Sequence, residues 1–163
     1  MKINMLGEYK KIETEVMKAM LDLSGLKAGE VYIDLGSGDS HFVIEAEERG
    51  AIASGIEFNE SLVNNGKTLG LNIIHGDIFD ADVSKADVIT FWFVGSDVIK
   101  LMDKLYAEMK PKARLIATSD NRKVYKNKIF IPEESGNTYL DSHRWQPSNK
   151  VELFGRLLYL YVR

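Results

Sequence analysis

Three acidic residues stand at the ends of successive apolar segments in the first half of the chain. Asp34 lies near the end of the segment that begins at Val31, Glu57 closes the next segment, and Asp77 follows Gly76 after the third. Carboxylates accept hydrogen bonds from hydroxyl and amino groups, and they attract cations. Ligands of parallel sheets bind at the carboxyl ends of the strands, so three acids at successive strand ends predict one binding edge.

A glycine turn follows the first of these acids. The sequence Asp34-Leu35-Gly36-Ser37-Gly38 ends an apolar segment, and a helix-like run begins at His41. Glycine permits the unusual backbone angles of a sharp bend and lets a ligand approach the bare backbone. The free N–H groups at the start of the next helix suit an electron-rich ligand edge. The pattern predicts a strand, a turn and a helix that hold a nucleoside cofactor.

The same turn favours one class of cofactor over another. A dinucleotide fingerprint reads Gly-x-Gly-x-x-Gly, but His41 occupies the position of the third glycine. Asp34 would repel a pyrophosphate, whereas it would attract the ammonium and sulfonium groups of S-adenosylmethionine. The turn therefore favours S-adenosylmethionine over a nicotinamide dinucleotide. An ordinary turn also uses two glycines to bend the chain, and on the turn alone this alternative stays open.

The other two acids extend the hypothesis to the rest of the nucleoside. Glu57 is placed to accept both ribose hydroxyls, and Asp77 can accept from the adenine amino group while Ile78 and Phe79 pack on the ring. Taken singly, Glu57 could be a helix-capping charge and Asp77 an ordinary turn residue. The predicted cofactor-binding residues are Asp34, Gly36, Ser37, Gly38, Glu57, Phe58, Asp77 and Ile78.

Composition restricts the remaining functions. The chain has 163 residues and a net charge of −3, which fits one domain with a core and disfavours broad, non-specific nucleic-acid binding. It has no cysteine, which excludes disulfides, thiolate nucleophiles and cysteine-ligated zinc. The three histidines lack metal-ligand spacing, so no metal is expected. No apolar run resembles a signal peptide or a membrane span, which predicts a cytoplasmic protein without a membrane partner.

The elements that must position these residues alternate between strand and helix. This rhythm predicts an α/β fold with a mostly parallel sheet and right-handed crossovers. Near the C-terminus the rhythm changes, and we expect residues 128–131 and 153–162 to form an antiparallel hairpin, with residues 133–151 as a loop. The expected helices are 11–23, 41–49, 60–69 and 97–109, and the expected parallel strands are 31–35, 51–57, 72–75, 86–93 and 114–118.

Four motifs carry a resemblance to a known family. They are Asp34-Leu35-Gly36-Ser37-Gly38, Gly55-Ile56-Glu57, Gly76-Asp77 and the apolar segment 86–93. With these motifs the chain resembles the class I, seven-stranded S-adenosylmethionine-dependent methyltransferases. The resemblance implies a three-layer, Rossmann-like sheet in a single domain of residues 1–163, with an N-terminal helix segment of residues 1–30 ahead of a core of residues 31–163.

A closer likeness is to the minimal archaeal protein-lysine methyltransferases. It rests on four segments, which are Val16-Met17-Lys18-Ala19-Met20-Leu21, Gly76-Asp77-Ile78-Phe79, Asp87-Val88-Ile89-Thr90-Phe91-Trp92-Phe93 and Leu158-Tyr159-Leu160-Tyr161-Val162. The likeness implies transfer of a methyl group to a protein lysine. The chain departs from the family pattern twice. Ser40 stands where a third glycine is common, and Ile12-Glu13 stands where the lysine enzymes often have Thr-Pro.

Methyl transfer from a sulfonium mainly requires positioning and desolvation, so we predict no catalytic base. Phe91, Trp92 and Phe93 end the fourth strand, where the acceptor should enter, and aromatic faces there could hold an amine near the sulfonium. Alternation places Phe91 and Phe93 on one face and Trp92 on the other, and either set could simply be core. A small metabolite or RNA as acceptor, and a cofactor-binding module without turnover, remain as alternatives.

Overall fold

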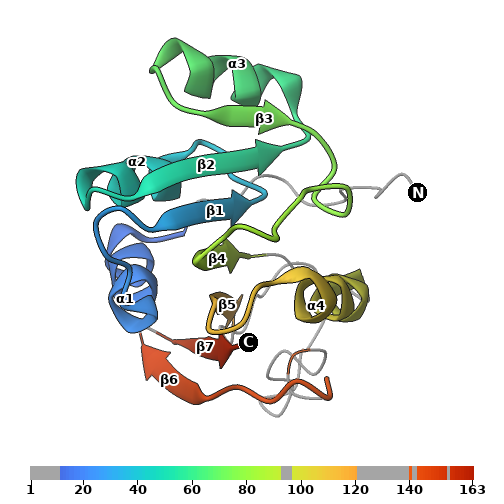
Figure 1. Ribbon diagram of the computed structural model, residues 1–163. Helices are drawn as coiled ribbons and strands as arrows, with labels where there is room; N and C mark the ends of the chain where they lie inside the picture. The colour runs from blue at the N-terminus through green and yellow to red at the C-terminus, as the bar shows by residue number, and fades with distance from the viewer. Residues whose placement is uncertain (1–11, 93–96, 121–139, 141–142, 154) are drawn as a thin grey trace, which may run out of the picture.

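The computed structural model describes residues 12–92, 97–120, 140, 143–153 and 155–163. In this part of the chain, strands and helices alternate as far as β5, except that β4 follows β3 with no helix between them (Figure 1). The helices are α1 (Thr14–Ser24), α2 (His41–Glu48), α3 (Glu60–Thr68) and α4 (Asp97–Glu108). The strands are β1 (Val31–Leu35), β2 (Ile52–Glu57), β3 (Ile73–His75), β4 (Val88–Phe91), β5 (Arg114–Asp120), β6 (Asn149–Leu153) and β7 (Arg156–Val162).

The seven strands form one sheet in the order β3-β2-β1-β4-β5-β7-β6. The first five strands are parallel, and β7 pairs antiparallel with both β5 and β6. The chain builds outward from β1 to β3 and then returns to place β4 on the other side of β1. This reversal makes a topological switch point at the carboxyl ends of β1 and β4, which is where such sheets bind ligands.

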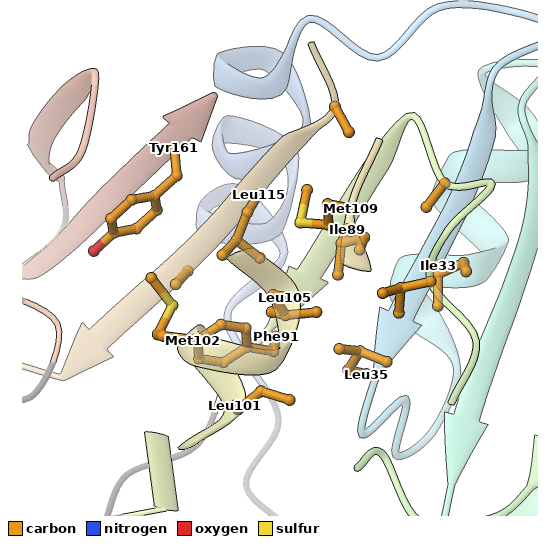
Figure 2. Close-up of a cluster of buried hydrophobic side chains, with 14 of the residues drawn as sticks. Ile33, Leu35, Ile89, Phe91, Leu101, Met102, Leu105, Met109, Leu115 and Tyr161 are labelled. Carbon is orange, nitrogen blue, oxygen red and sulfur yellow. The ribbon is translucent and has the colours of Figure 1, made fainter. Parts of the chain in front are cut away.

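Helices cover both faces of the sheet, which makes three layers. Figure 1 shows α1 and α2 on one side of the sheet and α4 on the other. Alternate strand residues point to opposite faces, so Tyr32 packs in the cluster beneath α1 and α2, whereas Ile33 packs in the cluster beneath α4. Figure 2 shows the α4 side, where Phe91 lies among side chains of that helix.

The sheet ends in an antiparallel C-terminal pair, as predicted, but the bounds predicted for its last strand were wrong. We expected residues 153–162 to be one strand, whereas the structure has β6 up to Leu153 and β7 from Arg156. Gly155 between them adopts a φ of 71°, the left-handed region that suits a tight turn. Because β6 begins at Asn149, residues 133–151 are not wholly a loop. The expected strand at 128–131 lies outside the described residues.

The segment before β6 is anchored by its aromatic side chain. Trp145 is buried between Tyr106 of α4 and Tyr161 of β7, and its indole N–H donates to the carbonyl of Val162 at 3.3 Å. This position holds the segment against the α4 side of the core. In the described part of the chain, no helix has the length and apolar character needed to cross a membrane.

Candidate functional site

The glycine turn after β1 is fixed to β2 and open on its other side. The backbone N–H groups of Gly36 and Ser37 donate to the carbonyl of Ile56 at 2.8 and 3.0 Å. Gly36 has a φ of 81°, and a Cβ placed on it would meet no heavy atom within 4 Å. The backbone at Gly36 is therefore open, which is what the predicted approach of a ligand to the bare backbone requires.

The turn lies directly on β2 because a second glycine leaves room for it. A Cβ on Gly55 would come within 2.5 Å of the Cβ of Ser37, a separation that real side chains do not show. Ser37 is buried, and its hydroxyl has no hydrogen-bond partner among the described residues. The turn thus brings an unsatisfied hydroxyl to the same edge as the acidic residues.

Glu57, at the end of β2, ties this turn to the start of α3. Its side chain is buried, and one carboxylate oxygen accepts from the backbone N–H of Gly38 at 2.8 Å. The other oxygen accepts from the backbone N–H of Asn59 at 2.7 Å. Two oriented N–H groups compensate the loss of hydration, so the carboxyl group is held at the switch point in a defined position.

Asp34, next to Glu57 across β1 and β2, is buried with much less compensation. Its side chain is 5% exposed, and the hydroxyl of Thr90 donates to it at 2.7 Å. Among the described residues it forms no ion pair with a basic side chain. Burial raises the pKa of Asp34 to about 7, the Thr90 hydrogen bond opposes this, and the nearby charges of Glu57 and Asp39 add to it. A cationic ligand group would supply the missing compensation.

The predicted adenine-side residues line the same edge but are more exposed. Asp77 accepts from the backbone N–H of Phe79 at 2.9 Å, so it forms the turn that was its alternative role. Ile78 and Phe79 are partly buried against the α4 side of the core. The ring of Phe58 is 54% exposed, and the carbonyl of Phe58 lies 2.9 Å from Nε2 of His75.

Ser40 takes up the backbone conformation that a glycine would adopt at this position. Its φ of 66° and ψ of 13° are left-handed, and its side chain is completely buried. The space for this side chain comes from Gly66 in α3, since a Cβ on Gly66 would lie 2.9 Å from the Ser40 hydroxyl oxygen. The departure from the family pattern is therefore accommodated by a glycine on the facing helix.

Phe91, the last residue of β4, and Trp92, which follows it, lie on opposite faces of the sheet, as alternation predicted. Phe91 is 1% exposed and packs in the α4-side core, an environment that favours a packing role. Trp92 packs partly buried on the α1 side, where the guanidinium carbon of Arg156 lies 5.0 Å from the centre of its ring. Nε of Arg156 in turn lies 3.0 Å from a carboxylate oxygen of Glu13. Phe93 lies outside the described residues.

The sequence analysis missed two polar partners at this edge. Thr90 was treated as part of an apolar strand, although it pairs in register with Asp34 across β1 and β4. Arg156 was treated as part of an apolar strand as well, although its side chain is 1% exposed. In both cases the available signal was a polar residue within a buried strand, which requires a partner.

Comparison with known proteins shows the family to which this chain belongs. Residues 34–119 match the family of the ANTKMT methyltransferase domain. A protein-lysine N-methyltransferase of Saccharolobus islandicus (strain REY15A) is 30% identical over 139 residues, which cover 79% of this chain and 86% of that protein. The chain belongs to the ANTKMT methyltransferase family. It is a class I, S-adenosylmethionine-dependent methyltransferase, as its motifs implied.

Solved structures agree with this assignment. An RNA methyltransferase of Salinibacter ruber, bound to S-adenosyl-L-homocysteine, superposes with a TM-score of 0.75 at 26% identity and covers 94% of this methyltransferase and 93% of its own chain. A methyltransferase of Aquifex aeolicus superposes with a TM-score of 0.66 at 21% identity, covering 90% and 89% of the two chains, and this likeness concerns the fold. The predicted Rossmann-like, mostly parallel sheet with an antiparallel C-terminal pair is confirmed.

Proposed function

We propose that this methyltransferase transfers a methyl group from S-adenosylmethionine to the side-chain amine of a protein lysine, acting as a single domain over residues 1–163. The observation that supports this acceptor is the likeness to the archaeal protein-lysine N-methyltransferase, which extends over 86% of that protein. A lysine side chain is long, so its amine can reach a site at the end of a sheet while its own backbone stays outside.

The proposed cofactor site follows the carboxyl ends of β1, β2 and β3. Asp34 would face the cationic amino-acid end, because it is a buried acid that forms no ion pair among the described residues. The open backbone at Gly36, with Ser37 and Gly38, would adjoin the same end. Glu57 would accept from the ribose hydroxyls, and Asp77, with Phe58 and Ile78, would adjoin the adenine.

The bound cofactor supplies an activated methyl group on a sulfonium, and the residues of this chain position and desolvate the reactants. The acceptor would enter beside Trp92, whose indole N–H is buried without a hydrogen-bond partner among the described residues. Phe91 and Phe93 stay as the other predicted acceptor-side residues, and the burial of Phe91 makes Trp92 the first of the three to test. No catalytic base is proposed, since a neutral amine attacks without one.

A label-transfer experiment tests the acceptor. Purified protein is incubated with methyl-labelled S-adenosylmethionine and a cell lysate, and the products are split into protein, RNA and small-molecule fractions. Label in protein that peptide mass spectrometry assigns to lysine is the expected result. Label only in RNA or small molecules would overturn the lysine proposal.

Matched variants connect this transfer to the proposed acceptor side. Trp92→Ala should lower the rate of transfer while cofactor affinity stays within about twofold, because Trp92 lies beyond the nucleoside site. Tyr106→Ala removes an aromatic side chain from the opposite, α4 side of the sheet and should leave transfer unchanged in the folded protein. Equal rates in the wild type and Trp92→Ala would contradict the placement of the acceptor.

RNA is the second candidate acceptor. It is favoured by the Salinibacter ruber structure, an RNA methyltransferase at 26% identity that covers 93% of its own chain. The RNA fraction of the same experiment tests this candidate. Label that is released by nuclease but not by protease would identify RNA as the acceptor.

Two further expectations belong to the proposal. We propose the cytoplasm as the compartment, which cell fractionation tests. We also propose that no metal takes part, and within the described residues no three histidine, aspartate or glutamate side chains gather as metal ligands. Transfer at an unchanged rate after dialysis against a chelator is the expected result.

A further inference from the structure

Three buried polar side chains, Tyr32, Thr90 and Asp34, are joined in a row by hydrogen bonds. The hydroxyl oxygen of Tyr32 lies 2.5 Å from the hydroxyl oxygen of Thr90, and the Thr90 hydroxyl lies 2.7 Å from a carboxylate oxygen of Asp34. Tyr32 and Asp34 are two residues apart on β1, and Thr90 is the register partner of Asp34 on β4. All three side chains therefore point to the α1 and α2 face, where each is at most 5% exposed.

The donor and the acceptor in each of these hydrogen bonds are fixed when Asp34 is ionised. A carboxylate only accepts hydrogen bonds, so Thr90 must donate its single hydroxyl hydrogen to Asp34. Thr90 then accepts from Tyr32. Tyr32 is completely buried, and burial raises its pKa well above the ordinary value, so it keeps its proton and stays a donor. Tyr32 thus prevents the Thr90 hydroxyl from turning toward another acceptor.

In the described part of the chain, the charges of Glu57 and Asp39 both oppose the ionisation of Asp34. Arg156, beside Trp92 on the same face, is paired with Glu13. Glu57 comes from β2 and Asp39 from the turn before α2, and both are acids. Oδ1 of Asp39 lies 2.5 Å from Nδ1 of His41 at the start of α2. The two helices packed on this face contribute apolar side chains, which are Val16, Met17, Met20 and Leu21 of α1 and Phe42, Val43 and Ala46 of α2. Thr90 is thus the group that favours the ionised form of Asp34.

We propose that Thr90, held by Tyr32, is a positioning residue for cofactor binding that directs a hydrogen bond at Asp34 and so prepares its carboxylate for the cationic end of the cofactor. The inference rests on the proposed role of Asp34 in the cofactor site. It adds a function for two strand residues that are not part of the glycine turn.

Carboxyl-carbon NMR titration tests the hydrogen bond directly in the ligand-free protein. The wild-type Asp34 signal, assigned by its loss in Asp34→Asn, should titrate near pH 7. In Thr90→Val it should titrate about one pH unit higher, because a hydrogen bond to the charged form is lost. Thr90→Ser keeps the hydroxyl and should restore the wild-type midpoint. An unchanged midpoint in Thr90→Val would overturn the inference.

Two nucleoside probes test the consequence for binding. S-adenosylhomocysteine carries the amino-acid end, whereas 5′-methylthioadenosine lacks it. Near pH 6.5, Thr90→Val should bind S-adenosylhomocysteine roughly fivefold more weakly, because a smaller fraction of Asp34 is ionised, and should bind 5′-methylthioadenosine unchanged. An equal loss for both probes would indicate a merely structural role and overturn the inference.

A double variant separates positioning from stability. Thr90→Val leaves the Tyr32 hydroxyl buried without its acceptor, which lowers the unfolding midpoint. Tyr32→Phe with Thr90→Val removes both hydroxyls and should recover stability, while the Asp34 titration stays shifted upward. A titration that returns to the wild-type midpoint in the double variant would overturn the inference.

The role of Asp34 can fail separately from the inference. If Asp34→Asn binds both probes as the wild type does, the proposed role of Asp34 is wrong, and the inference about binding is wrong with it. If Asp34→Asn selectively loses S-adenosylhomocysteine but Thr90→Val does not, Asp34 keeps its role and the inference alone is wrong.

Discussion

Asp34 and Glu57 lie at the carboxyl ends of adjacent strands, and both carboxyl groups are buried, but their surroundings differ. Glu57 accepts from two backbone N–H groups, one in the glycine turn and one before α3. Asp34 accepts from one hydroxyl, and its pKa is raised to about 7 mainly by burial. The comparison indicates a division of work. Glu57 holds the glycine turn and the start of α3 in place. Among the described residues, the ionised form of Asp34 is stabilised by one hydrogen bond only, so it remains available to a cationic ligand.

The largest expected effect is a pH-dependent stabilisation by Asp34→Asn. Because the pKa of Asp34 rises from 3.8 to about 7 on folding, the folded protein keeps a proton that the unfolded chain releases. Asp34 therefore lowers wild-type stability as pH rises from 4 to 7. The unfolding free energy of Asp34→Asn minus that of the wild type should grow from near zero at pH 4 to about 4 kcal/mol above pH 7.

Urea denaturation of both proteins at a series of pH values measures this difference directly. Asp82→Asn is the control: hydrogen bonds from Ser84 lower the pKa of Asp82, so its difference from the wild type should not grow with pH. A constant difference between Asp34→Asn and the wild type would mean that Asp34 is already ionised and compensated at low pH.

Glu57→Gln should have the opposite effect on stability. Glutamine keeps one acceptor oxygen but turns an amide N–H₂ group toward a backbone N–H, so a buried donor loses its partner. The unfolding free energy should fall by about 3 kcal/mol. If Glu57 contacts the ribose as proposed, affinity for 5′-methylthioadenosine should fall about 100-fold, since both this contact and the hydrogen bond to the turn are lost.

Calorimetry and denaturation together check the Glu57 prediction. Glu60→Gln makes the same chemical change at an exposed position of α3 and should be close to neutral in both measurements. If Glu57→Gln were as stable as the wild type, Glu57 would not stabilise the fold, and the contrast drawn between Glu57 and Asp34 would be wrong.

The smallest expected effect concerns the segment between Asp34 and Glu57. Ser40→Gly should raise the unfolding free energy by about 1 kcal/mol, because glycine adopts the left-handed conformation without steric cost. Gly66→Ala should lower it by about 2 kcal/mol, since the new methyl group meets Ile73 and Ser40. In the double variant, the change in the free energy of unfolding should differ from the sum of the two single changes. A change equal to that sum, measured by denaturation, would contradict direct contact between the two positions.

The first half of the chain, from β1 to β4, was the more predictable part. The positions of Asp34, the glycine turn and Glu57 could be predicted from residue type, because acids and glycines seldom follow successive apolar segments by chance. The alternation of strands and helices predicted the parallel strands and the helices between them, with boundaries that differ from the structure by a few residues at most. The predicted faces of Phe91 and Trp92 followed from the two-residue period of a strand.

The C-terminal strand pair and the contacts between distant strands were predicted less well, for physical reasons. The turn between β6 and β7 lies inside a stretch that reads as one strand, because an exposed glycine in a strand pattern also fits a bulge. Thr90 and Tyr32 carry no motif, and their role depends on a register between strands that are distant in sequence. Contacts of this kind follow from sheet order, which local pattern does not encode.

The ion pair between Glu13 and Arg156 joins residues that are 143 positions apart. It fastens the beginning of α1 to the beginning of β7, and α1 also packs against β5 and β7. Such distant contacts form late, because most of the chain must first become ordered between them. The docking of α1 therefore depends on β7, which follows it by more than a hundred residues, and α1 gains its full set of contacts only after β7 has joined the sheet.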